Sequence, residues 1–383
     1  MRRSPFLLPA LLAAALSVGA AGCGGGADDG RGRARAGVTA APSVTGRADE
    51  RPDPTRPLAE PATPIAEVAR SNRRMRSMPL LEVDGALKVA AGADIVAVLA
   101  GDERGMRLWT GPADLAGPAD LKLAHSAVPE GATIPSWAPV HVGGSGDGVQ
   151  ITYPVCTGAR LLSCTAVRWT SSTGAEPIDG AGSGVVDVAA DTTSLAVVRS
   201  PSRTATQQEF QESDLETELW VRRDDGQERR IAGPPPIAIA LHGDTLAEVR
   251  LLPGDEGVCG ATDLVLHRLD EPLADPRELG DVICGLGGAR LVAADLDATS
   301  ARGLIAANGE DGHGTVLRYD PAATGRPRRE RLGADFEGGT FVSPTDLLVT
   351  GPVGNVECSG YFPDEAPRSA CLLTRLTLRG AAG

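Results

Sequence analysis

The sequence lacks the residue patterns that mark the common catalytic and cofactor sites. No GxSxG elbow occurs, since GGSGD (143–147) has Asp147 in place of the second glycine. Phosphate-binding loops and dinucleotide-binding fingerprints are also missing. The histidines stand singly, without an HxH or HExxH pair, at His125, His141, His242, His267 and His313. We therefore assign no catalytic, cofactor-binding or metal-binding residue, and expect each histidine to be a surface or packed residue.

The chain is also short of lysine and of positive charge. Lys88 and Lys122 are the only lysines among 37 basic residues, against 50 acidic ones, and the formal net charge is −13. An acidic surface repels phosphate backbones, which argues against nucleic acid as a partner. Because arginine replaces lysine throughout, the number of arginines does not by itself indicate an arginine-based binding site.

Long segments with a helical period are missing as well. The 48 glycines and 29 prolines are too frequent for a helical bundle and follow no collagen-like period. A folded part of about 300 residues still buries roughly three quarters of its unfolded surface, so the fold needs no cofactor for stability.

What is present begins with an export signal. In MRRSPFLLPALLAAALSVGAAGC (1–23), two arginines precede an apolar run, and small residues lead to Cys23. The apolar run is too short for a spanning helix. The ending Ala20-Ala21-Gly22-Cys23 resembles the bacterial lipobox, with Ala20 in place of the usual leucine. The resemblance implies a signal peptide over 1–22, a lipid on Cys23 and a place on the outer face of the cell membrane; the alternative is an ordinary signal peptide with an incidental cysteine.

The next segment has almost no large apolar residues. RADERPDPTRPLAEPATP (47–64) is typical of it, and such a composition cannot bury enough surface to offset the entropy of ordering. We therefore predict a disordered tether. The expected domain division is a lipidated cysteine and linker over 23–78 and a folded domain over 79–383.

The folded domain consists of short apolar or alternating runs, each closed by turn residues, which predicts an all-β body. The predicted strands are 94–101, 106–111, 149–155, 165–171, 194–200, 218–224, 246–252, 263–269, 303–308, 315–320, 346–351 and 372–378. They come in pairs that recur about every 50 residues, which indicates a six-bladed β-propeller.

The last predicted unit has too little sequence for a full blade. It contains 336–344, 346–351 and 372–378, and no later segment of the given sequence could supply a fourth strand. A three-stranded last blade would leave an unpaired edge. We therefore predict that residues 80–83 form its outer strand beside 372–378.

One segment carries a family resemblance. PSWAPVHVGGSGDGVQITY (135–153) resembles the blade motif of TolB-like propellers, a Pro-x-Trp-Ser-Pro-Asp-Gly turn followed by a strand, with Ala138 in place of the serine. The resemblance implies a TolB-like six-bladed lipoprotein that serves as a binding scaffold, without a particular ligand. We expect Trp137, Trp169 and Trp220 to pack within blades rather than stack on a ligand.

Beyond Cys23, an even number of cysteines on an exported chain indicates disulfides. Each successive pair falls within one predicted blade, and cysteines of different blades would be too far apart, since a bridge needs Cα atoms within about 7 Å. A zinc site is excluded by the spacing. The predicted bridges join Cys156 to Cys164, Cys259 to Cys284 and Cys358 to Cys371.

An acidic stretch, QQEFQESDLETE (207–218), separates the two predicted strands of the third unit. We interpret it as a solvated hairpin tip; the alternative is a charged loop that binds a partner.

These observations predict a membrane-anchored, extracytoplasmic propeller that acts as a non-catalytic scaffold for a protein or a cell-envelope ligand. The alternative is a propeller enzyme of the lactonase or glycan-lyase kind, with a divalent ion in the central channel. Such an enzyme needs several Asp, Glu, Asn or His side chains converging from different blades, which the fold alone does not supply.

Overall fold

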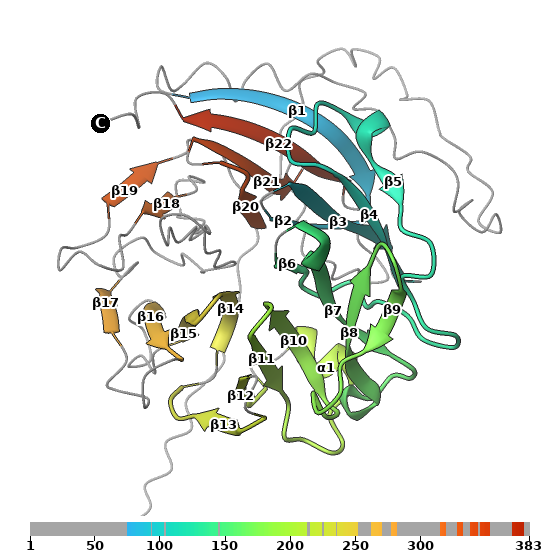
Figure 1. The fold of residues 1–383 in the computed structure, drawn as a ribbon, viewed down its shortest axis with the longest axis vertical. Coiled ribbons are helices and arrows are strands. Elements are labelled where there is room, and N and C mark those ends of the chain that lie inside the picture. The colour runs from blue at the N-terminus through green and yellow to red at the C-terminus, as the bar shows by residue number, and fades with distance from the viewer. Residues whose placement is uncertain are drawn as a thin grey trace, which may run out of the picture. The chain divides into compact units, whose positions relative to one another are not determined.

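Short β-strands make up almost all of the regular structure in a computed structural model of the chain (Figure 1). The structure describes residues 75–92, 94–102, 105–144, 146–212, 215–223, 226–234, 236–251, 262–269, 277–281, 315–318, 328–331, 338–343, 345–352 and 370–378. All of them belong to one compact unit, Pro52–Gly383. The prediction of an all-β body is confirmed.

The strands form sheets in chain order, and four of these sheets follow one another as blades 1 to 4. Blade 1 contains β2 (Ala86–Ala91), β3 (Ile95–Asp102), β4 (Gly105–Pro112) and β5 (Lys122–Leu123). Blade 2 contains β6 (His141–Gly143), β7 (Gln150–Cys156), β8 (Cys164–Thr170) and β9 (Gly174–Pro177). Blade 3 contains β10 (Val185–Ala190), β11 (Ser194–Arg199), β12 (Glu218–Arg223) and β13 (Glu228–Ile231). Blade 4 contains β14 (Pro236–His242), β15 (Thr245–Leu251), β16 (Thr262–Arg268) and β17 (Arg277–Asp281).

The sheets are arranged around a centre as in a β-propeller, with the first strand of each blade nearest the centre (Figure 1). Within the described residues, five four-stranded blades are present, against six predicted. In the remaining unit, β18 (Thr315–Arg318) pairs with β19 (Arg328–Arg331). The predicted strand 303–308 lies outside the described residues.

The closing blade joins both ends of the described chain. Its strand order is β20 (Gly338–Phe341), β21 (Asp346–Pro352), β22 (Ala370–Leu378) and β1 (Met75–Asp84). In the antiparallel β1–β22 pair, Leu81 lies opposite Leu373 and Val83 opposite Cys371. The predicted ring closure is confirmed, although the strand begins at Met75, inside the segment we expected to be linker.

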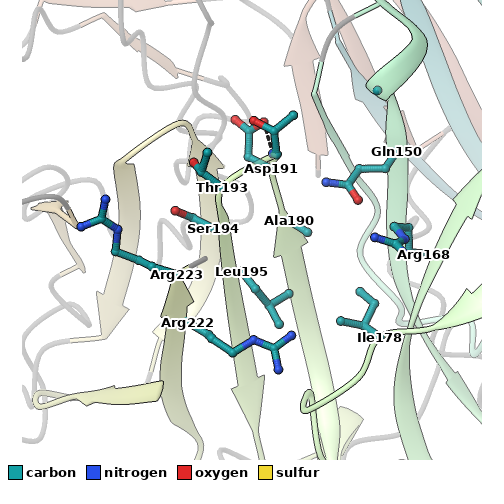
Figure 2. Close-up of a pocket in the computed structure, with 12 residues that line it drawn as sticks. Gln150, Arg168, Ile178, Ala190, Asp191, Thr193, Ser194, Leu195, Arg222 and Arg223 are labelled. Carbon is teal, nitrogen blue, oxygen red and sulfur yellow. Dashed lines mark hydrogen bonds between the residues drawn. The ribbon is translucent and has the colours of Figure 1, made fainter. Parts of the chain in front are cut away.

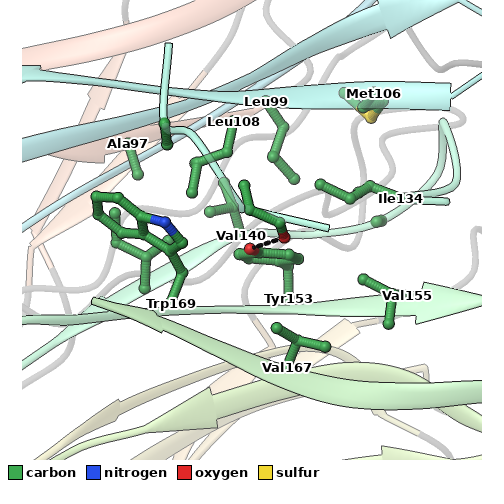
Figure 3. Packing of buried hydrophobic residues seen from close by; sticks show 14 of the residues in the cluster. Ala97, Leu99, Met106, Leu108, Ile134, Val140, Tyr153, Val155, Val167 and Trp169 are labelled. Atoms are coloured by element: carbon green, nitrogen blue, oxygen red, sulfur yellow. Dashed lines mark hydrogen bonds between the residues drawn. The ribbon is translucent and has the colours of Figure 1, made fainter. Parts of the chain in front are cut away.

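Side chains along the middle strands point alternately to the two faces of a blade, and the apolar ones form the core between blades. In the blade 1–blade 2 core, Leu99, Leu108 and Val167 are fully buried (Figure 3). Tyr153 is also buried there, and its hydroxyl donates a 2.5 Å hydrogen bond to the carbonyl of Ala127. Burial raises the pKa of the Tyr153 phenol well above its usual value of 10.0. Blades 1 and 2 are thus held together mainly by apolar side chains.

The tryptophans pack against protein side chains, and Trp169 does so between two blades rather than within one. Trp169 is 8% exposed and belongs to the blade 1–blade 2 core. Trp137 meets Phe210 edge to face, with ring centroids 5.0 Å apart. Trp220 lies under the guanidinium of Arg199, 5.4 Å from the ring centroid.

The acidic stretch 207–218 differs from the prediction, because it contains helix α1 (Gln207–Glu212) rather than only a hairpin tip. The backbone N–H of Glu209 donates to Thr206 Oγ1 over 3.1 Å, and the Thr206 N–H donates to Glu209 Oε2 over 2.8 Å. This reciprocal pair is a capping box, which favours the start of a helix. Among the described residues, no helix is long and apolar enough to cross a membrane.

Helix α1 also packs against blade 2. The N–H of Gln207 donates to the carbonyl of Ala159 over 2.9 Å, and its side-chain amide donates to Gly158 over 2.7 Å. The N–H of Leu161 donates to the carbonyl of Ala205 over 2.9 Å. The stretch therefore connects blade 3 to the β7–β8 loop of blade 2.

Candidate binding pocket between blades 2 and 3

A buried carboxylate organises the turns that follow the inner strands. Asp191 lies in the β10–β11 turn, and its side chain is 6% exposed. It accepts hydrogen bonds from the N–H groups of Gly144 at 3.0 Å, Thr192 at 2.7 Å and Gly243 at 2.5 Å. His242 Nδ1 lies 3.6 Å from the same carboxylate. Because Gly144, Asp191 and Gly243 belong to blades 2, 3 and 4, Asp191 fixes three consecutive blades at one mouth of the ring.

A second His–Asp pair lies on the inner strands themselves. His141 Nε2 on β6 is 2.7 Å from Asp187 Oδ1 on β10, and the side chains are 17% and 11% exposed. In the part of the chain that the structure describes, no group of three or more His, Cys, Asp or Glu side chains could hold a metal ion.

A close approach of backbones holds β6 against β10. A Cβ atom on Gly143 would lie 1.9 Å from the carbonyl oxygen of Ala190, so only glycine permits this spacing. The GGSGD segment is therefore the end of an inner strand and the turn after it, not a nucleophile elbow.

Beside Asp191, a cavity of about 340 Å³ opens between blades 2 and 3. Its walls include Gln150, Arg168 and Ile178 from blade 2, and Asp191, Leu195 and Arg222 from blade 3 (Figure 2). Figure 2 shows Gln150 and Arg168 on one side of the gap and Leu195 and Arg222 on the other. We refer to this cavity as the blade 2–3 pocket.

The strand register explains why these side chains share the gap. Arg222 lies opposite Leu195 in the β11–β12 pair, and Leu195 packs with blade 2 residues such as Ala166. On blade 2, Arg168 lies opposite Thr152, whose hydroxyl donates to the carbonyl of Val188 in blade 3 over 2.9 Å. Residues that lie opposite each other project from the same face of a sheet. Arg168 and Arg222 therefore face each other from adjacent blades.

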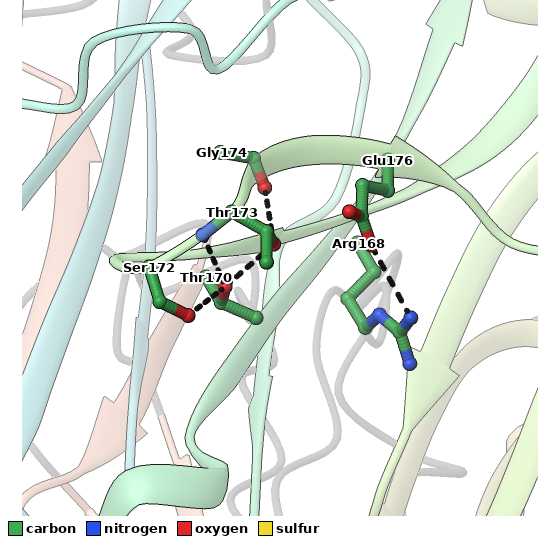
Figure 4. A network of polar contacts seen from close by, with 6 residues as sticks. All are labelled: Arg168, Thr170, Ser172, Thr173, Gly174 and Glu176. Carbon is green, nitrogen blue, oxygen red and sulfur yellow. Dashed lines mark hydrogen bonds and ion pairs between the residues drawn. The ribbon is translucent and has the colours of Figure 1, made fainter.

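The two arginines differ in their partners. Arg168 Nη2 lies 3.5 Å from Glu176 Oε2, beside the β8–β9 turn, and both side chains are about half exposed (Figure 4). Arg222 makes no hydrogen bond or ion pair with any described residue. Its Nη1 lies against Gly180, since a Cβ atom there would be 1.9 Å away. The pocket thus presents one loosely paired and one unpaired guanidinium.

The other side chains that line the pocket are partly polar and partly apolar. Gln150 is only 8% exposed, and its amide has no partner among the described residues. Leu195 is 7% exposed and contributes apolar surface. Arg223 also borders the pocket, but it points toward blade 4, where it donates to the carbonyl of Leu269 over 3.1 Å.

Blade 4 carries a different polar cluster, on the face that packs against blade 3. Glu248 Oε2 lies 2.7 Å from Arg250 Nη2 and 2.8 Å from His267 Nε2. The three residues are 1%, 7% and 3% exposed. The Arg250 guanidinium lies against Gly233, which follows the last strand of blade 3. All three side chains are buried and contact one another, so this cluster supports the packing of blade 4 against blade 3.

A disulfide joins Cys156 and Cys164, whose Cα atoms are 4.0 Å apart, and this is the first predicted bridge. Cys371 is disulfide-bonded as well, while its predicted partner lies outside the described residues. The other cysteines named above also lie outside them: Cys23, Cys259, Cys284 and Cys358. None of the described cysteines lines the blade 2–3 pocket.

Sequence reasoning missed the pocket and the partners of three histidines. His141 and His267 each lie near a carboxylate from another strand, and His242 lies near Asp191 in the β10–β11 turn. No local spacing could have indicated these pairs, because the partners meet only when strands or blades are placed side by side.

No family model matches the chain, and no curated protein matches it. Among solved structures, the chain is similar to a gluconolactonase from Xanthomonas campestris, with 15% identity and a TM-score of 0.49 over 85% of this chain and 99% of that one. It is also similar to TolB from Acinetobacter baumannii, with 12% identity and a TM-score of 0.44 over 74% of this chain and 64% of that one.

Proposed function

We propose that the protein is an exported lipoprotein whose propeller is a non-catalytic binding scaffold on the outer face of the cell membrane. In this proposal residues 1–22 are the signal peptide, Cys23 carries the lipid, and 23–78 connect it to the propeller. The ligand is a protein or a cell-envelope molecule. The observation that carries the binding role is the blade 2–3 pocket, with its unpaired Arg222 and Gln150.

Export is supported by two independent features. One is the pattern of basic, apolar and small residues that ends at Cys23. The other is the Cys156–Cys164 disulfide, since such bridges persist in oxidising compartments and are rare in the cytosol.

Binding without catalysis is supported by the chemistry of the pocket. Arginine and glutamine side chains bind and orient ligands, whereas hydrolysis needs an activated nucleophile or a general base. Asp191 is the carboxylate among the described lining residues, and three backbone N–H groups already occupy it. A carboxylate held in this way is suited to fixing turns.

The alternative, a propeller enzyme with a divalent ion in the central channel, is favoured by the His141–Asp187 pair on the inner strands and by the His242–Asp191 pair at their ends. Thermal unfolding with and without Ca²⁺, Mn²⁺ or Zn²⁺ separates the two functions, because a specific ion raises the melting temperature. We expect no rise. A rise that His141→Ala abolishes would favour the enzyme.

Anchoring is tested by Cys23→Ser, with Gly24→Ala as the matched control. We expect the unaltered chain and the control in the membrane fraction and Cys23→Ser in the soluble extracytoplasmic fraction. Membrane retention of Cys23→Ser would contradict the anchor. Release of the unaltered chain would instead favour an ordinary signal peptide.

A further inference from the structure

We propose that the blade 2–3 pocket binds an anionic oxygen group, a carboxylate or a phosphate, carried by a hydroxylated molecule of about the size of one sugar. Arg168 and Arg222 would hold the anion from opposite walls. This inference rests on the proposed binding function and names the class of ligand.

The first step is the chemistry of the two guanidinium groups. Arginine presents planar, paired N–H donors that match carboxylate and phosphate oxygens, and these charge-assisted bonds are stronger than neutral ones. Arg168 and Arg222 come from β8 and β12 and face the same cavity. An anion in this cavity could be approached by a cation from each wall.

The second step is that Arg222 differs from neighbouring arginines. Arg199 pairs with Glu228 at 2.5 Å, Arg230 with Glu218 at 3.1 Å, and Arg250 with Glu248 at 2.7 Å. With 50 acidic residues in the chain, carboxylates are plentiful, yet Arg222 has none among the described residues. Its lack of a partner is therefore a property of the pocket and not of an arginine-rich composition.

The third step concerns the body of the ligand. The Gln150 amide offers both a donor and an acceptor, and Thr192 and Thr193 also line the cavity. Ile178 and Leu195 supply apolar surface between these polar groups. A sugar presents the same mixture of hydroxyl groups and C–H surface. A cavity of about 340 Å³ lies at the small end of ligand pockets, which suits a single unit rather than a chain.

Two sources fit this chemistry, an acidic sugar and a sugar phosphate. Calorimetric titration of the full-length protein with glucuronate, glucose 1-phosphate and glucose separates them. We expect glucose not to bind. Binding of glucuronate alone indicates a carboxylate ligand, and binding of glucose 1-phosphate alone indicates a phosphate ligand. Binding of both indicates that the pocket recognises the negative charge of the ligand rather than one particular anionic group.

The variants Arg222→Gln and Arg168→Gln test whether the arginine on each wall of the pocket contributes to anion binding. Each should weaken binding by about 10-fold or more, the usual effect of losing a charged hydrogen bond. Arg229→Gln is the matched control, because Arg229 is exposed on β13 of the same blade, and it should leave the affinity unchanged. The inference is overturned if no anionic probe binds at millimolar concentration, if glucose binds as tightly as glucuronate, or if Arg222→Gln has no more effect than Arg229→Gln.

A proton NMR spectrum of the titrated probe distinguishes failure of the inference from failure of the proposed function. An unaltered probe agrees with a scaffold. A chemically converted probe would contradict the non-catalytic function and leave the anion site standing. Conversely, binding of isolated cell envelope without any binding of the probes would contradict the anion site alone.

Discussion

The two interfaces of blade 3, with blade 4 and with blade 2, differ in how their arginine side chains are paired. Toward blade 4, Arg250 is 7% exposed and closed on Glu248 and His267, which are buried beside it. Toward blade 2, Arg168 and Arg222 face an open cavity, and Glu176 lies 3.5 Å from Arg168 on the exposed side. The same blade therefore has one sealed charged interface and one open one.

The difference shows what decides the role of an arginine in this chain. A buried guanidinium that keeps its carboxylate is part of the structure, because removing either partner leaves an uncompensated charge. A guanidinium beside a cavity and without a carboxylate remains available to a ligand. The comparison can be tested by removing charges or polar groups from each kind of interface.

The largest effect is expected at the sealed interface. Glu248→Gln would leave Arg250 buried without a charged partner and should lower the free energy of unfolding by about 3–5 kcal/mol. Glu176→Gln is the matched change at the open interface, where both side chains of the pair are about half exposed, and should cost less than about 1 kcal/mol. Urea unfolding measures both, and equal losses would show that the two interfaces do not differ in this way.

The apolar interface between blades 1 and 2 provides a reference with a smaller effect. Tyr153→Phe removes the hydrogen bond to the Ala127 carbonyl and should cost about 1 kcal/mol at neutral pH.

The same residue predicts a pH dependence. Burial raises the pKa of the Tyr153 phenol above its usual 10.0, so above that pH the unfolded chain loses a proton that the folded chain keeps. Stability should therefore fall as the pH rises past 10.0. In Tyr153→Phe this part of the alkaline loss should disappear. An unchanged alkaline slope would show that Tyr153 is not protected by burial.

The middle strands of each blade could be predicted because they are long and apolar. β11 (Ser194–Arg199) and β12 (Glu218–Arg223) match the predicted 194–200 and 218–224 closely. The inner strand β6 has only three residues, and the outer strand β13 reads Glu-Arg-Arg-Ile. Such strands form because a neighbouring strand supplies their hydrogen bonds, and their own sequence carries little signal.

Helix α1 was predictable in part, because Thr206 and Glu209 have the spacing of a capping box. The ring closure was predictable from a missing edge strand. The pocket was not, because Arg168 and Arg222 meet only through the register of β8 and β12 in adjacent blades. The periodicity of a single sequence indicates which side chains of a strand share a face, but not which neighbouring blade that face contacts.

The most direct test of the central claim, that Arg168 and Arg222 are held open for a ligand, is NMR of the arginine Nε–Hε groups during titration with the anionic probes. Signals are assigned with the Arg168→Gln, Arg222→Gln, Arg229→Gln and Arg250→Gln variants. We predict that the Arg168 and Arg222 signals shift in a saturable way while the Arg250 signal stays in place. Unmoved Arg168 and Arg222 signals, or equal shifts at Arg229, would contradict the account.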